Sequence, residues 1–299
     1  MLHSSVLTTV VLPLALAVIM LGLGLSLTFA DFARVISVPR AVGTALACQL
    51  VLMPALCLAL LALTGADTDT AVGMLLLAAS PGGTLAAVYS HFARGDIALN
   101  ITLTAVNSLL AVVTLPLVMW GVTRHYLGHA HNIGLQPHGV LTLIATVVLP
   151  VALGMTLRRL RPGLAQSLKR AVRIVALVVL LVVVVGAILH NSRELGRSLS
   201  SILPLTAAFS VLNLVIGYWV PRLVRVERPQ AVASSMEIGI HNGALAVAIA
   251  LSPALLNMPA AAVAPAIYIP VSLLTAAVAV LLLARRTCSL PMVESVTST

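Results

Sequence analysis

Residues 234–243 have the sequence SSMEIGIHNG, which places the acid Glu237 and a polar, glycine-containing break inside a segment otherwise apolar enough to cross a membrane. A carboxylate at that depth is costly, so such residues usually belong to functional sites. A second break, SPGGT at residues 80–84, interrupts an earlier apolar segment. Two interrupted apolar segments at corresponding positions are typical of the binding site of a secondary transporter.

The composition around these breaks is that of a polytopic membrane protein. Hydrophobic residues make up 60% of the chain and charged residues 8%, with a mean hydropathy of +1.12, which excludes an ordinary soluble domain. Because lipid offers no partner to backbone groups, each apolar segment of about 20 residues is expected to be a helix. The sequence predicts an all-α protein with nine transmembrane helices, at 6–29, 42–63, 71–93, 97–122, 139–157, 171–189, 201–221, 230–255 and 263–284.

The basic residues predict the orientation of these helices. Fourteen of the 17 Lys and Arg residues fall in alternate loops, whereas Arg124, Arg193 and Arg197 fall on the other side. The positive-inside rule then puts the amino terminus outside and the carboxyl terminus in the cytoplasm of a multi-pass protein of the cell (inner) membrane. The net charge of +9 therefore reflects orientation in the bilayer and indicates no nucleic-acid partner.

The positions of the two breaks predict an internal repeat. They lie in the third and eighth predicted helices, five helices apart and antiparallel, as an inverted-topology repeat requires. We expect one transporter unit over residues 1–299, with a first repeat of four helices at about 6–122, a second of five at about 139–284, and a short cytoplasmic tail at 285–299. No repeated sequence string supports this arrangement, which rests on position alone.

Helix breaks at Pro81, Gly82, Gly83 and Gly239 would expose backbone groups at membrane depth. Proline lacks a backbone N–H and glycine resists helical ordering, so both segments can unwind. The exposed carbonyls can coordinate a cation, and the amino termini of the half-helices suit an anionic solute. The alternative is a plain kink, which is common in membrane helices but does not explain Glu237.

Three strings make the chain resemble the bile acid:sodium symporter family over nearly its whole length, as a bacterial member. SPGGT at 80–84, followed by ARGDIAL at 93–99, is similar to the first crossover helix of the family. EIGIHN at 237–242 is similar to the second, where the family usually has Glu-x-Gly-x-Gln-Asn. Gln49, ahead of Met53-Pro54, matches a glutamine in an early helix of the family.

The resemblance implies panel and core domains, with the two broken helices crossing in the core, and symport of small organic anions with sodium. The solute class implied is bile-acid-like or other carboxylate compounds. The implied cation-binding residues are Gln49, Asn100, Thr104, Glu237, Ile238, Ile240 and His241, and Thr84 and Asn242 are the implied contacts to the solute. Beyond the organic anion, the coupling ion and the lipid bilayer, the sequence indicates no cofactor and no obligate protein partner.

Two departures from the family pattern affect the expected ion sites. Ala86 and Ala87 replace a Ser-Asn pair and supply no oxygen, so the resemblance implies that the first sodium site is weakened or lost. His241 replaces a glutamine, and its imidazole is a poorer partner for sodium than an amide oxygen. Because histidine titrates near neutral pH, His241 and Glu237 could form a proton-sensitive pair. A proton-coupled or sodium-independent carrier is thus the alternative, unless His241 only hydrogen-bonds across the break.

Other readings of the same residues are a membrane-embedded enzyme and a solute sensor or channel. Glu237 and His241 are four residues apart, a spacing that could serve acid–base chemistry on one helix face. However, the sequence offers no nucleophile with a base and no metal-ligand set. Outside the main set, Asn107, Ser108, Thr114 and Asn213 could line the cavity or simply join helices. Asp96, in the turn Arg94-Gly95-Asp96, is expected to cap the next helix.

Overall fold

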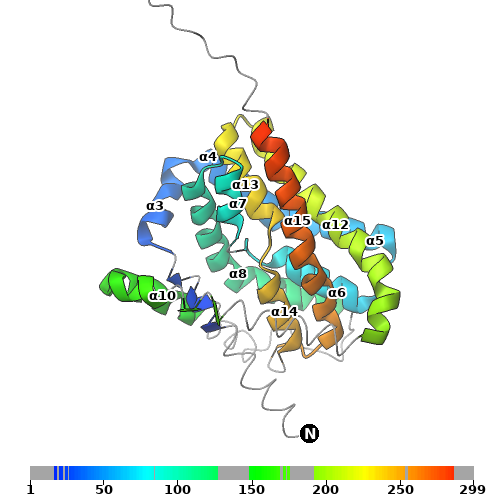
Figure 1. The fold of residues 1–299 in the computed structure, drawn as a ribbon. Helices are drawn as coiled ribbons and strands as arrows, with labels where there is room; N and C mark the ends of the chain where they lie inside the picture. Colours follow the sequence, from blue (N-terminus) through cyan, green and yellow to red (C-terminus); the bar gives the residue numbers. More distant parts are fainter. Residues whose placement is uncertain are drawn as a thin grey trace, which may run out of the picture.

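The computed structural model describes residues 17–83, 85–126, 148–175, 192–252 and 255–285, apart from positions 19, 23, 26, 169, 170 and 173. In these ranges the chain forms helices and no strand, as expected for a protein whose backbone groups must find partners within lipid. The predicted all-α class is therefore confirmed for this part of the chain (Figure 1).

Three helical stretches are long and apolar enough to cross a membrane. They are Pro39–Thr64, Leu199–Leu223 and Pro259–Ala284, which correspond to the predicted spans at 42–63, 201–221 and 263–284. The first combines α4 (Pro39–Ala47), the π-helical turn η2 (Cys48–Leu52) and α5 (Met53–Thr64); the second lies in α12 (Ser192–Leu223); the third joins η4 (Pro259–Ala262) to α15 (Val263–Arg285).

The predicted span at 97–122 lies in α8 (Ile97–Tyr126), which bends by 53° between Ile97–Ala111 and Val113–Tyr126. It would count as a fourth span if the bent helix crosses as one. Two shorter helices are α3 (Phe29–Ser37), which contacts α8, and α10 (Leu149–Leu160), at the lower left of Figure 1. The predicted spans at 6–29 and 171–189 fall largely outside the described residues, whereas the second half of the span predicted at 139–157 lies in α10.

The two remaining predicted spans are broken where the sequence predicts. The first consists of α6 (Thr68–Ala79) and α7 (Ala86–Phe92), with Pro81 and two glycines between them. The second consists of α13 (Arg228–Gly239) and α14 (Gly243–Leu251). The Asn242 side chain accepts a hydrogen bond from the Leu245 N–H at 3.1 Å and so caps α14.

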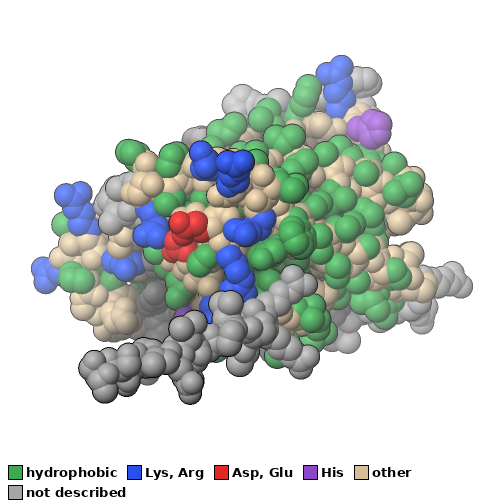
Figure 2. Space-filling model, turned by 90° about the horizontal axis from the view of Figure 1, so that it is seen from above, with side chains coloured by type: hydrophobic (Ala, Val, Ile, Leu, Met, Phe, Trp, Pro, Cys, Tyr) green, Lys and Arg blue, Asp and Glu red, His purple; other side chains and the backbone are tan. Residues whose placement is uncertain are grey.

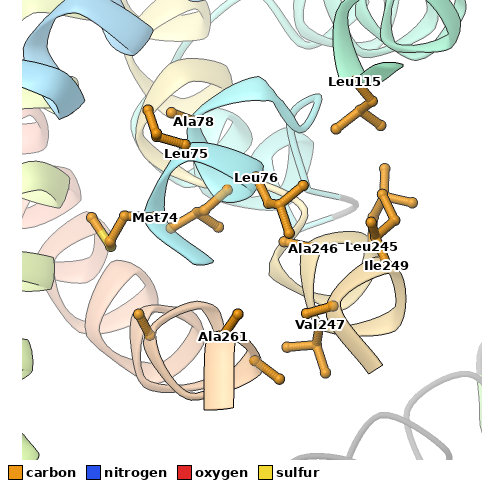
Figure 3. Packing of buried hydrophobic residues seen from close by; sticks show 14 of the residues in the cluster. Met74, Leu75, Leu76, Ala78, Leu115, Leu245, Ala246, Val247, Ile249 and Ala261 are labelled. Atoms are coloured by element: carbon orange, nitrogen blue, oxygen red, sulfur yellow. The ribbon is translucent and has the colours of Figure 1, made fainter. Parts of the chain in front are cut away.

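Apolar side chains of the half-helices α6 and α14 belong to the largest buried cluster, which other helices complete. Met74, Leu75 and Leu76 of α6 belong to this cluster together with Leu245 and Ile249 of α14, and Leu76 is the one of the three that lies toward α14 in Figure 3. All five side chains are at most 5% exposed. This packing, together with contacts of α13 to α7, α8 and α12, holds both breaks inside the helix bundle.

Basic side chains gather at the end of the bundle where α12 passes into α13, the face shown in Figure 2. At this end Asp96 accepts a hydrogen bond from the Leu99 N–H at 2.9 Å, which confirms the predicted cap of α8. The other Asp96 oxygen pairs with Arg34 of α3 at 2.7 Å. The Asp96 N–H also donates to the Pro229 carbonyl, so this turn connects α3, α8 and α13.

Candidate functional site

The two breaks lie against each other at a point that we call the crossing, formed by residues 80–83 and 240–242. Gly82 and His241 form an isolated antiparallel bridge. The Gly83 N–H donates to the Ile240 carbonyl at 2.5 Å, and the Asn242 N–H donates to the Pro81 carbonyl at 2.8 Å. Backbone groups that lost their helical partners at each break are therefore satisfied by the other break.

Gly82 allows the crossing to lie directly against Glu237. A Cβ atom at position 82 would overlap the Glu237 carboxylate, so any side chain there would have to displace this acid. The Gly82 backbone also hydrogen-bonds this carboxylate. From the sequence, Gly82 was expected only to unwind the helix. In the structure it has a second role, because its missing side chain leaves room for the Glu237 carboxylate.

The acidic side of the crossing consists of Glu237 and the residues of α8 and α13 around it. Glu237 is fully buried. Thr104 donates to one of its carboxylate oxygens at 2.6 Å, and the Asn107 amide nitrogen lies 3.5 Å from the other. Asn100, Thr104 and Asn107 occupy positions i, i+4 and i+7 of α8 and so share the helix face that meets α13.

Oxygen atoms without partners also lie on this side. Among the described residues, Asn100 Oδ1, Asn107 Oδ1 and Ser234 Oγ are buried and have no hydrogen-bond partner. The Asn100 amide nitrogen donates to the Ala233 carbonyl at 3.0 Å, which turns its oxygen away from that bond. Buried oxygens normally have partners, so a group of unpaired ones beside a carboxylate suits a cation.

The opposite side, which we call the imidazole side, consists of Gln49, His241, Phe209 and Tyr268. Gln49 lies in the π-helical turn η2, five residues before Pro54. Proline cannot donate a helical hydrogen bond and its ring displaces the preceding turn, which accounts for the local widening. The Gln49 amide nitrogen lies 3.0 Å from the Ser80 carbonyl and 3.2 Å from His241 Nε2.

Tyr268 of α15 completes the hydrogen bonds of this side. Its hydroxyl donates to the Gly239 carbonyl at 2.8 Å and lies 3.3 Å from His241 Nδ1. The rings of Phe209 and Tyr268 lie 5.7 Å and 5.8 Å from the His241 ring, measured between centroids. The imidazole is thus enclosed by one aromatic ring from α12 and another from α15.

The structure brings most of the predicted site residues to the crossing, but on two different sides. Asn100, Thr104 and Glu237 meet on the acidic side, whereas Gln49 and His241 meet on the imidazole side. No hydrogen bond joins the Glu237 and His241 side chains, both of which lie in the described part of the chain. Two other groups of the predicted site already accept hydrogen bonds within the protein, namely the Ile240 carbonyl and the Asn242 side-chain oxygen. Ile238, another predicted cation-binding residue, is buried.

Other predictions have mixed outcomes. Thr84, one of the two predicted contacts to the solute, lies outside the described residues. Ala86 is fully buried in α7 and offers no oxygen, as expected.

Sequence reasoning missed Phe209 and Tyr268 because only the packing of α12 and α15 brings them to the crossing. Asn107 was noted only as a cavity or packing residue, although its spacing from Thr104 on α8 could have identified it.

Comparison with known proteins identifies the family. The model of the sodium bile acid symporter family matches residues 13–197, which is more than half of the chain and includes the first break. The relative "Uncharacterized sodium-dependent transporter YocS" of Bacillus subtilis is 24% identical over 236 residues, which are 79% of this chain and 72% of the relative.

Two further relatives come from a plant and a mammal. "Probable sodium/metabolite cotransporter BASS1, chloroplastic" of rice (Oryza sativa subsp. japonica) is 25% identical over 77% of this chain and 56% of its own length. "Sodium/bile acid cotransporter 4" of the mouse (Mus musculus) is 31% identical over 68% of this chain. This chain spans only 46% of the mouse protein and about half of the plant one. The family match over residues 13–197 covers the first break but ends before the second, and on this match the chain belongs to the sodium bile acid symporter family.

Proposed function

We propose that the protein is a secondary transporter that couples the movement of a small organic anion to sodium, with the cation bound at Glu237. The observation that carries this proposal is the acidic side, where a fully buried carboxylate lies among unpaired buried oxygens. Family membership and the sodium-dependent relatives support the coupling ion. They also decide against the membrane-embedded enzyme, because the family is one of symporters.

The proposed cation ligands are the Glu237 carboxylate, the Thr104 hydroxyl and the side-chain oxygens of Asn100 and Asn107. Sodium is a hard cation that favours oxygen, and these groups supply one negative charge and several neutral oxygens. Asn107 brings an oxygen to a site where Ala86 and Ala87 bring none. We therefore propose that this site is retained despite the two alanines.

The organic anion is proposed from the resemblance and from the names of the relatives, which include bile acid and metabolite cotransporters. Asn242, at the amino terminus of α14, and Thr84 are the proposed contacts to its head group. A helix amino terminus favours negative charge, and the Asn242 amide nitrogen can donate to it.

For the whole chain we propose nine spans in an inverted repeat, divided into panel and core domains. The antiparallel bridge between the breaks supports the inverted relation of the two broken helices. The amino terminus is proposed to lie outside and the carboxyl terminus in the cytoplasm. The gathering of basic side chains on one face supports this orientation (Figure 2).

Proton coupling is the second candidate, because a titratable imidazole, His241, lies buried at the crossing itself. The two candidates differ in the ligand that stabilises the folded protein. Sodium-coupled transport requires a sodium-specific effect, whereas proton coupling requires a Glu237-dependent effect of pH without one.

Thermal melting of the purified protein tests the cation site without knowledge of the solute. Sodium in place of potassium, at equal ionic strength, is expected to raise the melting temperature, since a ligand at 100 times its Kd stabilises by about 2.7 kcal/mol. Glu237→Gln should abolish the shift. Glu227→Gln is the matched control, because Glu227 is exposed at the amino terminus of α13 and should leave the shift intact.

A sodium shift that persists in Glu237→Gln would contradict the proposed site. Transport itself is tested in proteoliposomes with labelled taurocholate and a set of labelled monocarboxylates. Accumulation driven by a sodium gradient is expected for at least one of them and should be absent in Glu237→Gln. A sensor would show the melting shift without any accumulation.

A further inference from the structure

We infer that the crossing binds a single cation, at Glu237, because the imidazole of His241 closes its other side, so that one sodium ion is transported per cycle. This inference rests on the proposed function, since it takes Glu237 as the sodium site. It adds the number of ions, which neither the family match nor the names of the relatives provide.

The two sides of the crossing differ in the atoms that they turn inward. The acidic side has a carboxylate and three unpaired oxygens, from Asn100, Asn107 and Ser234. The imidazole side has ring nitrogens, an amide N–H group, two aromatic rings and neutral amide oxygens, but no carboxylate. A hard cation favours the first set of atoms and finds few ligands in the second.

The hydrogen bonds of the imidazole side fix His241 in one neutral form. Tyr268 donates its only proton to the Gly239 carbonyl, so it can only accept from His241, and Nδ1 must carry the ring proton. Nε2 is then an acceptor, which matches the Gln49 amide N–H beside it. Turning the Gln49 amide around would place its oxygen against the Ser80 carbonyl, so its present orientation is favoured.

The backbone carbonyls next to His241 are already engaged. Those of Ser80 and Gly239 accept from Gln49 and Tyr268, and those of Pro81 and Ile240 accept from the opposite break. A cation entering here would have to compete with these bonds. Among the described residues, the unpaired oxygens on this side are Gln49 Oε1 and Asn213 Oδ1, the latter on an amide whose nitrogen lies 3.5 Å from the Tyr268 hydroxyl. Two neutral amide oxygens without a carboxylate cannot replace a hydration shell.

His241 therefore acts as a built-in substitute for an ion on this side: it links η2 and α15 through hydrogen bonds and brings no charge in its neutral form. With one sodium ion at Glu237, a cycle moves one positive charge. Co-transport of a monovalent anion is then electroneutral.

Equilibrium binding of radioactive sodium to the purified protein in detergent tests the number of ions directly. The wild-type chain is expected to bind one ion with a Hill coefficient near one, and Glu237→Gln to bind none. Two ions per chain would overturn this inference and leave the proposed function standing. No bound sodium in the wild type would instead contradict the proposed function, and an ion retained by Glu237→Gln would place the site elsewhere.

His241→Gln separates a closing role from a ligand role. Binding of one sodium ion by His241→Gln agrees with the inference. Binding of two ions also agrees with it, because the new amide oxygen would join the unpaired Gln49 oxygen once the imidazole is gone. Loss of all sodium from a folded His241→Gln variant would make His241 a ligand of the bound ion and overturn the inference. His91→Gln, at an exposed position of α7, is the matched control, and melting in potassium verifies that each variant is folded.

Discussion

Glu237 shows how far a single residue can be interpreted from sequence. Its place in an apolar segment predicted a functional acid, and the structure buries it fully with Thr104 at 2.6 Å. An uncompensated buried carboxylate would cost several kcal/mol, so a cation or a proton must accompany it. The sequence could not show that Asn107 takes part, because small polar residues join membrane helices at many positions.

Gly82 gives a prediction at the same scale. Gly82→Ala would drive a methyl group into the Glu237 carboxylate, so we expect a loss of about 1–3 kcal/mol in stability and loss of the sodium-dependent melting shift. Gly43→Ala is the control, because a Cβ at this exposed position of α4 meets no atom within 4 Å. A Gly82→Ala protein that melts like the wild type and keeps its sodium shift would refute the close contact.

At the scale of elements, the two broken helices were predictable, because Pro81 and the glycines cannot sustain a helix. The π-helical turn at Gln49 was not predicted, although Pro54 offers a physical reason for it after the fact. The part played by Tyr268 depends on how α15 packs against α12 and α14. Contacts between distant elements of this kind leave no periodic signal in one sequence.

The turn before α8 yields a stability prediction for an element. Asp96→Ala removes both the cap of α8 and the ion pair with Arg34, and should cost about 1–2 kcal/mol, mostly from the cap. Arg34→Gln removes only the ion pair, which is partly exposed, and should cost less than about 1 kcal/mol. Thermal melting of both variants in potassium makes the comparison. Equal losses would show that the ion pair, and not the cap, dominates this turn.

At the scale of the whole molecule, hydropathy predicted the long helices well, as the stretches at Pro39–Thr64, Leu199–Leu223 and Pro259–Ala284 show. Their burial within the bundle is partial, so their outer surfaces carry apolar residues such as Leu63, Leu274 and Leu282. Such exposed leucines are suited to lipid. Length and composition determine these helices, whereas the relation between the two repeats depends on packing that hydropathy does not encode.

The proposed orientation can be tested on the whole chain in a Gram-negative host. Green fluorescent protein fused after Thr299 should fluoresce, because this domain matures in the cytoplasm, and alkaline phosphatase at the same place should be inactive. Alkaline phosphatase fused after Ala130 should be active, because the proposed orientation places the loop after Arg124 outside the cytoplasm. The reverse pattern would invert the proposed topology.

The backbone bonds at the crossing also have a mechanical consequence. Separating the two broken helices would leave the Gly83 and Asn242 N–H groups without acceptors in a water-poor interior, a cost of about 1–3 kcal/mol for each. The two half-helix pairs should therefore travel as one rigid body during transport. On the proposed function, access from one side of the membrane to the other would then come from sliding between this body and its neighbours, with the proposed ion carried along inside it.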